Sequence, residues 1–111
     1  MRVRTEVTIS VAHQLPNYKG NCHNLHGHSV KVEIIAVGPV NKKTGMVVDF
    51  KELKEIVNKF DHSFLNDALE NPTAENITTY LLKQFKKKYP KLHFTVRVWE
   101  SGTSYAEDKV W

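Results

Sequence analysis

Two stretches of the chain alternate hydrophobic and polar residues with the period of two that is typical of half-buried strands. In residues 3–13 the apolar side chains occupy odd positions, and this face ends at His13. In residues 26–36 the even positions are apolar, and this face begins with His26 and His28. We therefore predict two long strands, each with histidine at the end that adjoins the connecting segment.

Two more extended segments follow from the same pattern. In residues 94–100, Phe94, Val96 and Val98 share one face with Glu100, which predicts a last long strand. Residues 46–50, the sequence MVVDF, favour a short extended piece.

Helical periodicity appears in two places. Residues 50–60 repeat apolar side chains at helical spacing after Asp49, which resembles the first residue of a capping box. A second amphipathic pattern follows Thr73, a suitable N-cap, and stops before Pro90. The segments 15–27 and 61–73 are rich in turn residues and predict irregular connections.

This order of elements predicts an α+β fold, an antiparallel sheet with two helices on one face. A length of 111 residues fits a single domain covering 1–111, with room for one core and one site. So small a sheet has exposed edge strands, which favours a homo-oligomer.

Composition and charge narrow the class of protein. The hydrophobic content of 41% is ordinary for a soluble domain, and no apolar run is long enough to cross a bilayer. A single cysteine and the lack of an N-terminal signal-like block favour a reducing, cytoplasmic setting. The net charge of +4 comes largely from residues 83–91, where lysines at a helix end complement the helix dipole. We therefore expect a small anionic substrate rather than nucleic acid or a membrane.

Three histidines are candidates for metal ligands. If the first two strands pair antiparallel, His13, His26 and His28 converge on one face, because neighbouring strands lie about 4.8 Å apart. A lone buried histidine is usually a hydrogen-bonded core residue, but three on one face match the three-ligand pattern of catalytic zinc. Zinc is favoured over iron or copper because no carboxylate or methionine is placed as a further ligand.

Cys22 has two possible roles in such a site. As a fourth ligand it would close a structural zinc site; as a free thiol beside the metal it would act in proton transfer or as a nucleophile. Its position in the connection, away from the strands that carry the histidines, favours the second role. His23 is interpreted as a loop residue.

Two further carboxylates are candidates for the chemistry. Asp61 and His62 are adjacent, and a carboxylate can orient a histidine for acid–base work, although such pairs also occur as helix caps. Glu100 continues an apolar face, which is costly unless the carboxylate binds something. The N–H edge of a guanidine-like heterocycle would suit it.

Together these residues resemble the 6-pyruvoyl-tetrahydropterin synthase family, which includes 6-carboxy-tetrahydropterin synthase. The resemblance runs in order over nearly the whole chain: His13, Cys22-x-x-x-His26-Gly27-His28, the segment from Thr44 to Phe50, Asp61-His62 with Leu65-Asn66, the segment from Pro72 to Asn76, and Glu100. It implies the T-fold, or tunnelling fold, in which trimers join their sheets into a barrel and two trimers stack as a hexamer.

The resemblance also implies a role for each site residue. His13, His26 and His28 would bind Zn²⁺, and Cys22 would abstract the proton with Asp61 and His62 as the relay. Glu100 would anchor the pterin ring, and Thr73 and Glu75 would line its pocket from this or a neighbouring subunit. The family substrate is 7,8-dihydroneopterin triphosphate, whose hydroxyls and carbonyl zinc would polarise.

The length and the motifs favour one product within the family. The compact chain resembles the carboxy enzyme of 7-deazaguanine biosynthesis, the route to queuosine or archaeosine, and the pyruvoyl synthase is the alternative. Some family variants replace or supplement the cysteine with a glutamate and then tend to cleave the side chain. Residues 21–25 contain no glutamate, which argues against that chemistry. The alternatives from another functional class are a non-catalytic pterin-binding protein and a structural zinc module that binds nucleic acid through residues 83–91.

Overall fold

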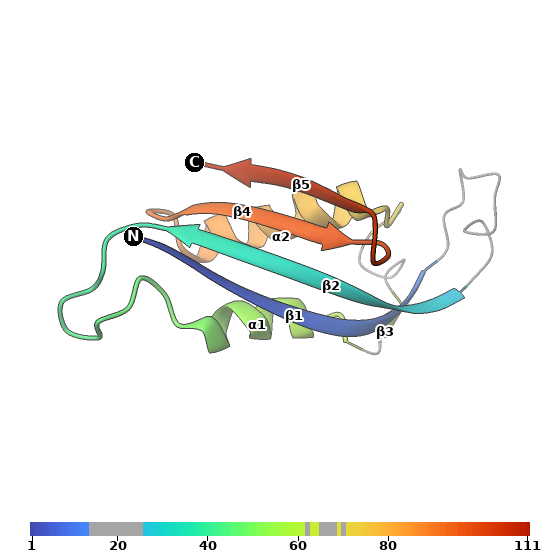
Figure 1. Cartoon of the computed structure of the whole chain (residues 1–111), viewed down its shortest axis with the longest axis horizontal. Helices are drawn as coiled ribbons and strands as arrows, with labels where there is room; N and C mark the ends of the chain where they lie inside the picture. Colours follow the sequence, from blue (N-terminus) through green and yellow to red (C-terminus); the bar gives the residue numbers. More distant parts are fainter. Residues whose placement is uncertain (14–25, 62, 65–68, 70) are drawn as a thin grey trace.

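The structure, a computed structural model, describes residues 1–13, 26–61, 63–64, 69 and 71–111, and gives the backbone alone at residues 13, 26–28 and 63–64. These residues form a sheet covered by two helices (Figure 1). The elements are β1 (Arg2–His13), β2 (His26–Val37), α1 (Phe50–Asn58), β3 (Ser63–Phe64), α2 (Ala74–Lys88), β4 (His93–Trp99) and β5 (Tyr105–Val110). The predicted α+β class is confirmed.

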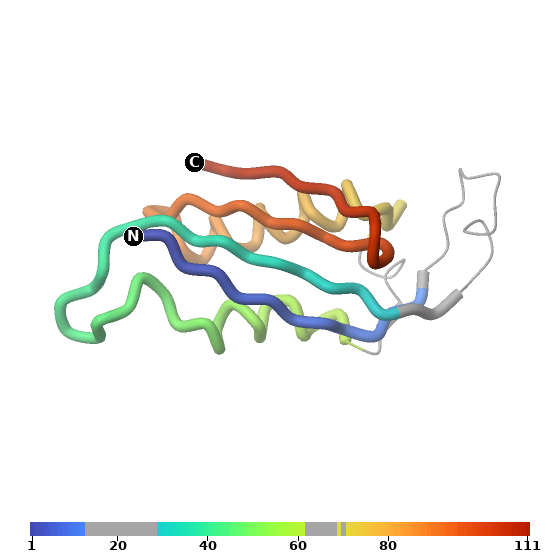
Figure 2. Tube along the Cα trace, viewed as in Figure 1, coloured from blue at the N-terminus to red at the C-terminus, as the bar shows by residue number. Residues whose placement is uncertain are grey.

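The strand order in the sheet is β3-β1-β2-β4-β5. The pairs β1–β2, β2–β4 and β4–β5 are antiparallel, and the two-residue β3 runs parallel to β1. β1 and β2 pair along their whole lengths, from Arg2 opposite Val37 to His13 opposite His26. The chain trace places both termini at one end of the sheet, so the His13–His26 pair lies at the opposite end (Figure 2).

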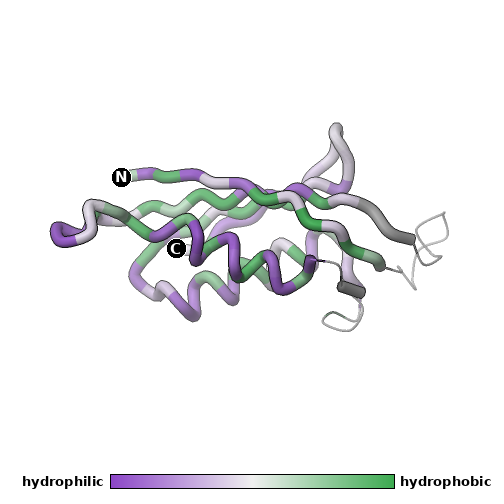
Figure 3. Tube along the Cα trace, turned by 90° about the horizontal axis from the view of Figure 1, so that it is seen from below, coloured by the Kyte–Doolittle hydropathy of each residue, from purple (hydrophilic) through white to green (hydrophobic). Residues whose placement is uncertain are grey.

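One hydrophobic core fills the space between the sheet and both helices. Alternate residues of β1, β2 and β4 are buried there, together with the apolar faces of α1 and α2. Phe85 of α2 stacks on Phe94 of β4 with ring centroids 5.4 Å apart. Hydrophobic and hydrophilic segments alternate within the turns of the helices, as an amphipathic helix requires (Figure 3). No helix among the described residues is long and apolar enough to cross a membrane.

Each helix begins at the residue that the sequence indicates. The side chain of Asp49 accepts a hydrogen bond from the Lys51 N–H at 2.9 Å, and that of Thr73 accepts from the Asn76 N–H at 3.1 Å. The helices are also joined to each other, because the Tyr89 hydroxyl donates to Glu52 Oε2. Burial and this carboxylate raise the pKa of Tyr89, so the hydroxyl keeps its proton across the physiological range.

The sheet face away from the helices contains a buried carboxylate. Glu33 of β2 is 4% exposed, and it accepts hydrogen bonds from Arg4 Nε at 3.2 Å and Trp99 Nε1 at 2.6 Å. Arg97 lies 3.6 Å from the same carboxylate. Burial alone would raise the pKa of Glu33, but the hydrogen bonds from Arg4 and Trp99 outweigh it and the pKa is lowered. Glu33 therefore joins β1, β2 and β4 as a charged group.

The structure differs from the predicted elements in three places. Residues 46–50 are not a strand, because Asn41 closes a loop by donating its N–H to the Met46 carbonyl at 2.8 Å and α1 begins at Phe50. β3 lies in the segment predicted to be irregular, and β5 follows the strand predicted to be the last. β3 escaped prediction because two residues are too few to show an alternating pattern. β5 escaped it because it is an edge strand with few buried side chains.

We expect Glu33→Gln to lower the free energy of unfolding at pH 7 by about 1–2 kcal/mol, because it removes the charge that Arg4 and Trp99 bind. Since the folded-state pKa lies below the ordinary value of 4.5, this stabilisation is complete above about pH 4.5. It is lost as the pH falls through the folded-state pKa. Urea unfolding of both proteins from pH 3 to pH 7 measures it. The exposed Glu55→Gln on α1 is the control, and a wild-type advantage that does not shrink in acid would contradict the assignment.

Candidate active site at one end of the sheet

The three histidine positions lie together at the end of the β1–β2 pair. His13 is the register partner of His26, and His28 is the partner of Val11. These positions continue the alternate row that includes Val11 and Val30, both buried in the core. The backbone therefore brings the three positions to one end and one row of the sheet, as the sequence pattern predicts.

Glu100 comes to the same end from the other side of β2. β4 runs antiparallel to β2, and its last register pair is Trp99 with Lys31, so Glu100 follows next to the start of β2. It is half-buried and continues the row of Phe94, Val96 and Val98. Its N–H donates to the Ser104 carbonyl at 2.9 Å in the turn to β5, which fixes the backbone at this carboxylate.

Asp61 is attached to β1 by its side chain. The Ser10 N–H donates to Asp61 Oδ1 at 2.9 Å, and two residues later Ser63 becomes the register partner of Val11. Val11 is also opposite His28, so β3, β1 and β2 are neighbours at this level. The segment that contains the predicted relay thus runs beside the strand that ends in His13. His62 and Cys22 lie outside the described residues.

Thr73 and Glu75 lie at the start of α2, whose first turn is at the same end of the molecule as the end of β4 (Figure 1). Thr73 is half-buried, and its hydroxyl oxygen caps the helix. A hydroxyl that accepts one hydrogen bond still has a proton to donate, so capping leaves it able to bind a ligand. Glu75 is exposed in the first turn, where its negative charge is favourable.

The predicted metal site rests on the three histidine positions. Among the side chains that the structure describes, no three of His, Cys, Asp or Glu gather closely enough to share a metal ion. The predicted ligands are at residues 13, 26 and 28, where the backbone alone is described. Three imidazoles on neighbouring positions of two paired strands are a donor set that fits zinc.

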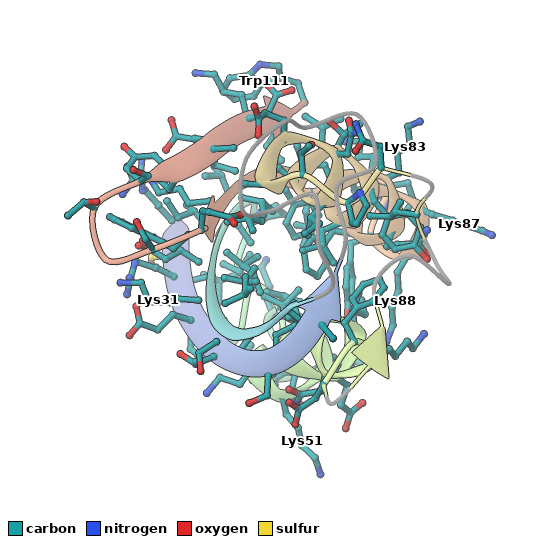
Figure 4. All side chains as sticks on the ribbon, turned by 90° about the vertical axis from the view of Figure 1, so that its right-hand side faces the viewer. Lys31, Lys51, Lys83, Lys87, Lys88 and Trp111 are labelled. Carbon is teal, nitrogen blue, oxygen red and sulfur yellow. The ribbon has the colours of Figure 1, made fainter. Side chains whose placement is uncertain are left out.

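The lysines of α2 lie where a helix end predicts them. Lys86, Lys87 and Lys88 form its last turn, and Lys86 Nζ donates to the Leu92 carbonyl at 2.9 Å. Lys83 and Lys87 point outward on the α2 side of the molecule, away from Lys31 and Lys51 (Figure 4). A groove of about 460 Å³ between α2 and β5 is lined by Lys83, Lys86, Lys87 and Lys109.

Two contributors to this end of the molecule were missed in the sequence. The Ser10 N–H binds Asp61, and the Asn76 side chain binds the Asn71 carbonyl at 2.7 Å. The bond from Ser10 could not be predicted, because every residue except proline has a backbone N–H whatever its side chain. Asn76 could have been found from its position, because it is the third helical residue after the Thr73 cap, where side chains commonly bind the preceding turn.

Comparison with known proteins identifies the family. A family model described as 6-pyruvoyl tetrahydropterin synthase matches residues 2–109. The chain belongs to this family. A solved structure of the Caenorhabditis elegans 6-pyruvoyl tetrahydropterin synthase has a TM-score of 0.80 at 23% sequence identity, covering 100% of this chain and 96% of that one. The likeness confirms the T-fold for the single chain.

Relatives in the family carry more than one enzyme name. An Archaeoglobus fulgidus protein, provisionally named 6-carboxy-5,6,7,8-tetrahydropterin synthase, is 40% identical over 96% of this chain and 94% of its own. The Synechocystis 6-carboxy-5,6,7,8-tetrahydropterin synthase is 37% identical over 91% of this chain and 87% of its own. The Pyrococcus furiosus dihydroneopterin monophosphate aldolase is 34% identical over 78% and 79%. The first two relatives support the role of a pterin synthase.

We expect Asp61→Ala to lower the free energy of unfolding by about 0.5–1.5 kcal/mol, because it removes the acceptor of the Ser10 N–H. Asp61→Asn should stay within about 0.5 kcal/mol of the wild type, because its amide oxygen can accept the same bond. Urea unfolding at pH 7 measures both. Equal losses in the two variants would mean that the carboxylate charge, not the bond to Ser10, stabilises this end of β1.

Proposed function

We propose that the protein is a zinc-dependent lyase that converts 7,8-dihydroneopterin triphosphate to 6-carboxy-5,6,7,8-tetrahydropterin. The observation that carries the proposal is the register of β1 and β2, which sets His13 opposite His26 and His28 opposite Val11. The family match over residues 2–109 and the carboxy-type relatives support the substrate class. The cellular role would be 7-deazaguanine biosynthesis in the cytoplasm.

His13, His26 and His28 would hold the zinc ion. When bound, zinc supplies a Lewis acid that makes carbon-bound protons next to the polarised oxygens of a substrate easier to remove. Three imidazole ligands leave a coordination position for substrate, which is the usual arrangement of a catalytic site. The firm pairing of β1 with β2 suits this role, because it fixes the strand positions without the help of the metal.

The other site residues would handle protons and hold the pterin. Cys22 would take the carbon-bound proton as a thiolate, and His62 would exchange protons with it. Asp61, fixed to β1 through Ser10, would keep His62 in place. Glu100 would accept two N–H bonds from the guanidine-like edge of the pterin, and Thr73 and Glu75 would bound the pocket.

The resemblance also suggests a homo-oligomer built by joining sheets, as a hexamer of two trimers. The edge of the sheet supports this proposal, because β5 pairs with β4 alone among the described strands. Such an edge offers backbone donors and acceptors to a strand of another copy. Joining sheets in this way would close the edge of each subunit.

A second candidate function is 6-pyruvoyl-tetrahydropterin synthase, which acts on the same substrate. The description of the family model that matches the chain favours it. The same three histidines, Cys22 and Glu100 would serve either reaction, so the product decides between them.

We expect the zinc-loaded protein to release 6-carboxy-5,6,7,8-tetrahydropterin from 7,8-dihydroneopterin triphosphate, as measured by mass spectrometry. Cys22→Ala should lower kcat at least about 100-fold, because general acid–base groups commonly contribute that much. Its zinc content, measured by metal analysis, should stay at the wild-type level. His26→Ala should lose zinc. A Cys22→Ala variant that keeps full turnover, or that loses its zinc, would contradict the role given to the thiol.

We expect Glu100→Gln to raise KM for this substrate about tenfold or more, because a charged acceptor of two N–H bonds becomes a neutral amide. Steady-state kinetics measure this loss. Glu107→Gln is the matched control: Glu107 binds Arg97 on the opposite face of the sheet and should leave KM unchanged. An unchanged KM in the Glu100 variant would remove this carboxylate from the pterin pocket.

A further inference from the structure

The first turn of α2 is capped in an unusual way. In a capping box the side chain at the third helical position accepts a hydrogen bond from the N–H of the cap residue. Here that position is Asn76, and its Nδ2 donates to the Asn71 carbonyl at 2.7 Å. The Thr73 N–H donates to the same carbonyl at 2.9 Å. The Asn71 carbonyl therefore takes the place of the carboxylate of a capping box.

These bonds form a closed network with the cap. The Asn76 N–H donates to Thr73 Oγ1 at 3.1 Å while its side chain reaches back to Asn71. Asn76 thus contacts the turn at both of its ends. Pro72, between them, is buried and has a fixed φ. With its oxygen bound to the Asn76 N–H, the Thr73 hydroxyl can still donate its proton in another direction.

Helix stability alone does not account for asparagine at this position. Aspartate or glutamate in the first turn would interact better with the helix dipole and could complete an ordinary capping box. Neither can donate to the Asn71 carbonyl, because a carboxylate only accepts. An amide can hold this turn from the helix, whereas a carboxylate cannot. The turn carries Thr73 at the end of the molecule where Glu100 and the histidine positions lie.

We propose that Asn76 is a positioning residue for substrate binding, which fixes the turn of residues 71–73 and thereby orients the Thr73 hydroxyl toward the pterin ring. This inference rests on the proposed function and adds to it a residue that touches no substrate. It requires that loss of the amide donor weaken substrate binding while the fold and the chemical step are retained.

The variant Asn76→Asp tests this requirement, because it keeps the shape of the side chain, removes the donor and favours the helix dipole. We expect its urea midpoint to equal or exceed that of the wild type. KM for 7,8-dihydroneopterin triphosphate should rise about five- to tenfold, the effect of losing one well-placed hydrogen bond. We expect kcat to stay within about twofold. In a second variant, Asn76→Ala, whose side chain can neither donate nor accept, hydrogen exchange of the Thr73 amide should become faster.

Thr79→Ala is the matched control, because Thr79 Oγ1 donates to the Glu75 carbonyl in the same helix without touching the turn. It should leave KM and the Thr73 exchange rate unchanged. An Asn76→Asp protein with wild-type KM, or an equal rise of KM in the control, would overturn the proposal. A wild type without turnover would remove the proposed function and its substrate. An unchanged Thr73 exchange rate in Asn76→Ala would by itself refute the pinned turn.

Discussion

The register of β1 against β2 is the constraint on which the rest of the structure depends. The strands pair along their whole lengths, and the core takes one alternate row of the pair, which includes Ile9, Val11 and Val30. A slip of β1 by one residue would turn Ile9 and Val11 out of the core and carry position 13 to the face opposite positions 26 and 28. The apolar residues thus specify the site indirectly, because the same alternation that buries them aligns His13, His26 and His28.

The candidate site is assembled at one end of the fold from parts that are far apart in the chain. β1 and β2 provide the histidine positions, the turn after α1 provides Asp61, and the end of β4 provides Glu100. Thr73 comes from the start of α2. All of these elements contribute to one core, so polar groups at the end are held by apolar contacts behind them. Glu33 adds a charged link across the other face, close to Trp99 and therefore to Glu100.

Much of this arrangement follows from the sequence, and what does not has a physical reason. The alternation of apolar and polar residues predicts β1, β2 and β4, because each has one buried face. The N-caps Asp49 and Thr73 predict where the helices begin. β5 gives a weak signal because few of its side chains are buried. The prediction of an extended piece at residues 46–50 was wrong because Val48 is buried in a loop that Asn41 closes, without strand pairing. The hydrogen bond from Ser10 to Asp61 joins residues that are distant in sequence, and its donor is a backbone N–H, so a pattern of side chains cannot predict it.

The direct opposition of His13 and His26 also bears on how such a chain can diverge. A deletion of one residue within β1 would shift every later position of that strand to the wrong face. Loss of two residues from each strand, at register partners, would keep His13 opposite His26. The connection between the two strands starts and ends at register partners. Its length can therefore drift without displacing either histidine. Insertions and deletions should therefore be tolerated between residues 13 and 22, and should be rare in the strands and in the spacing from Cys22 to His26.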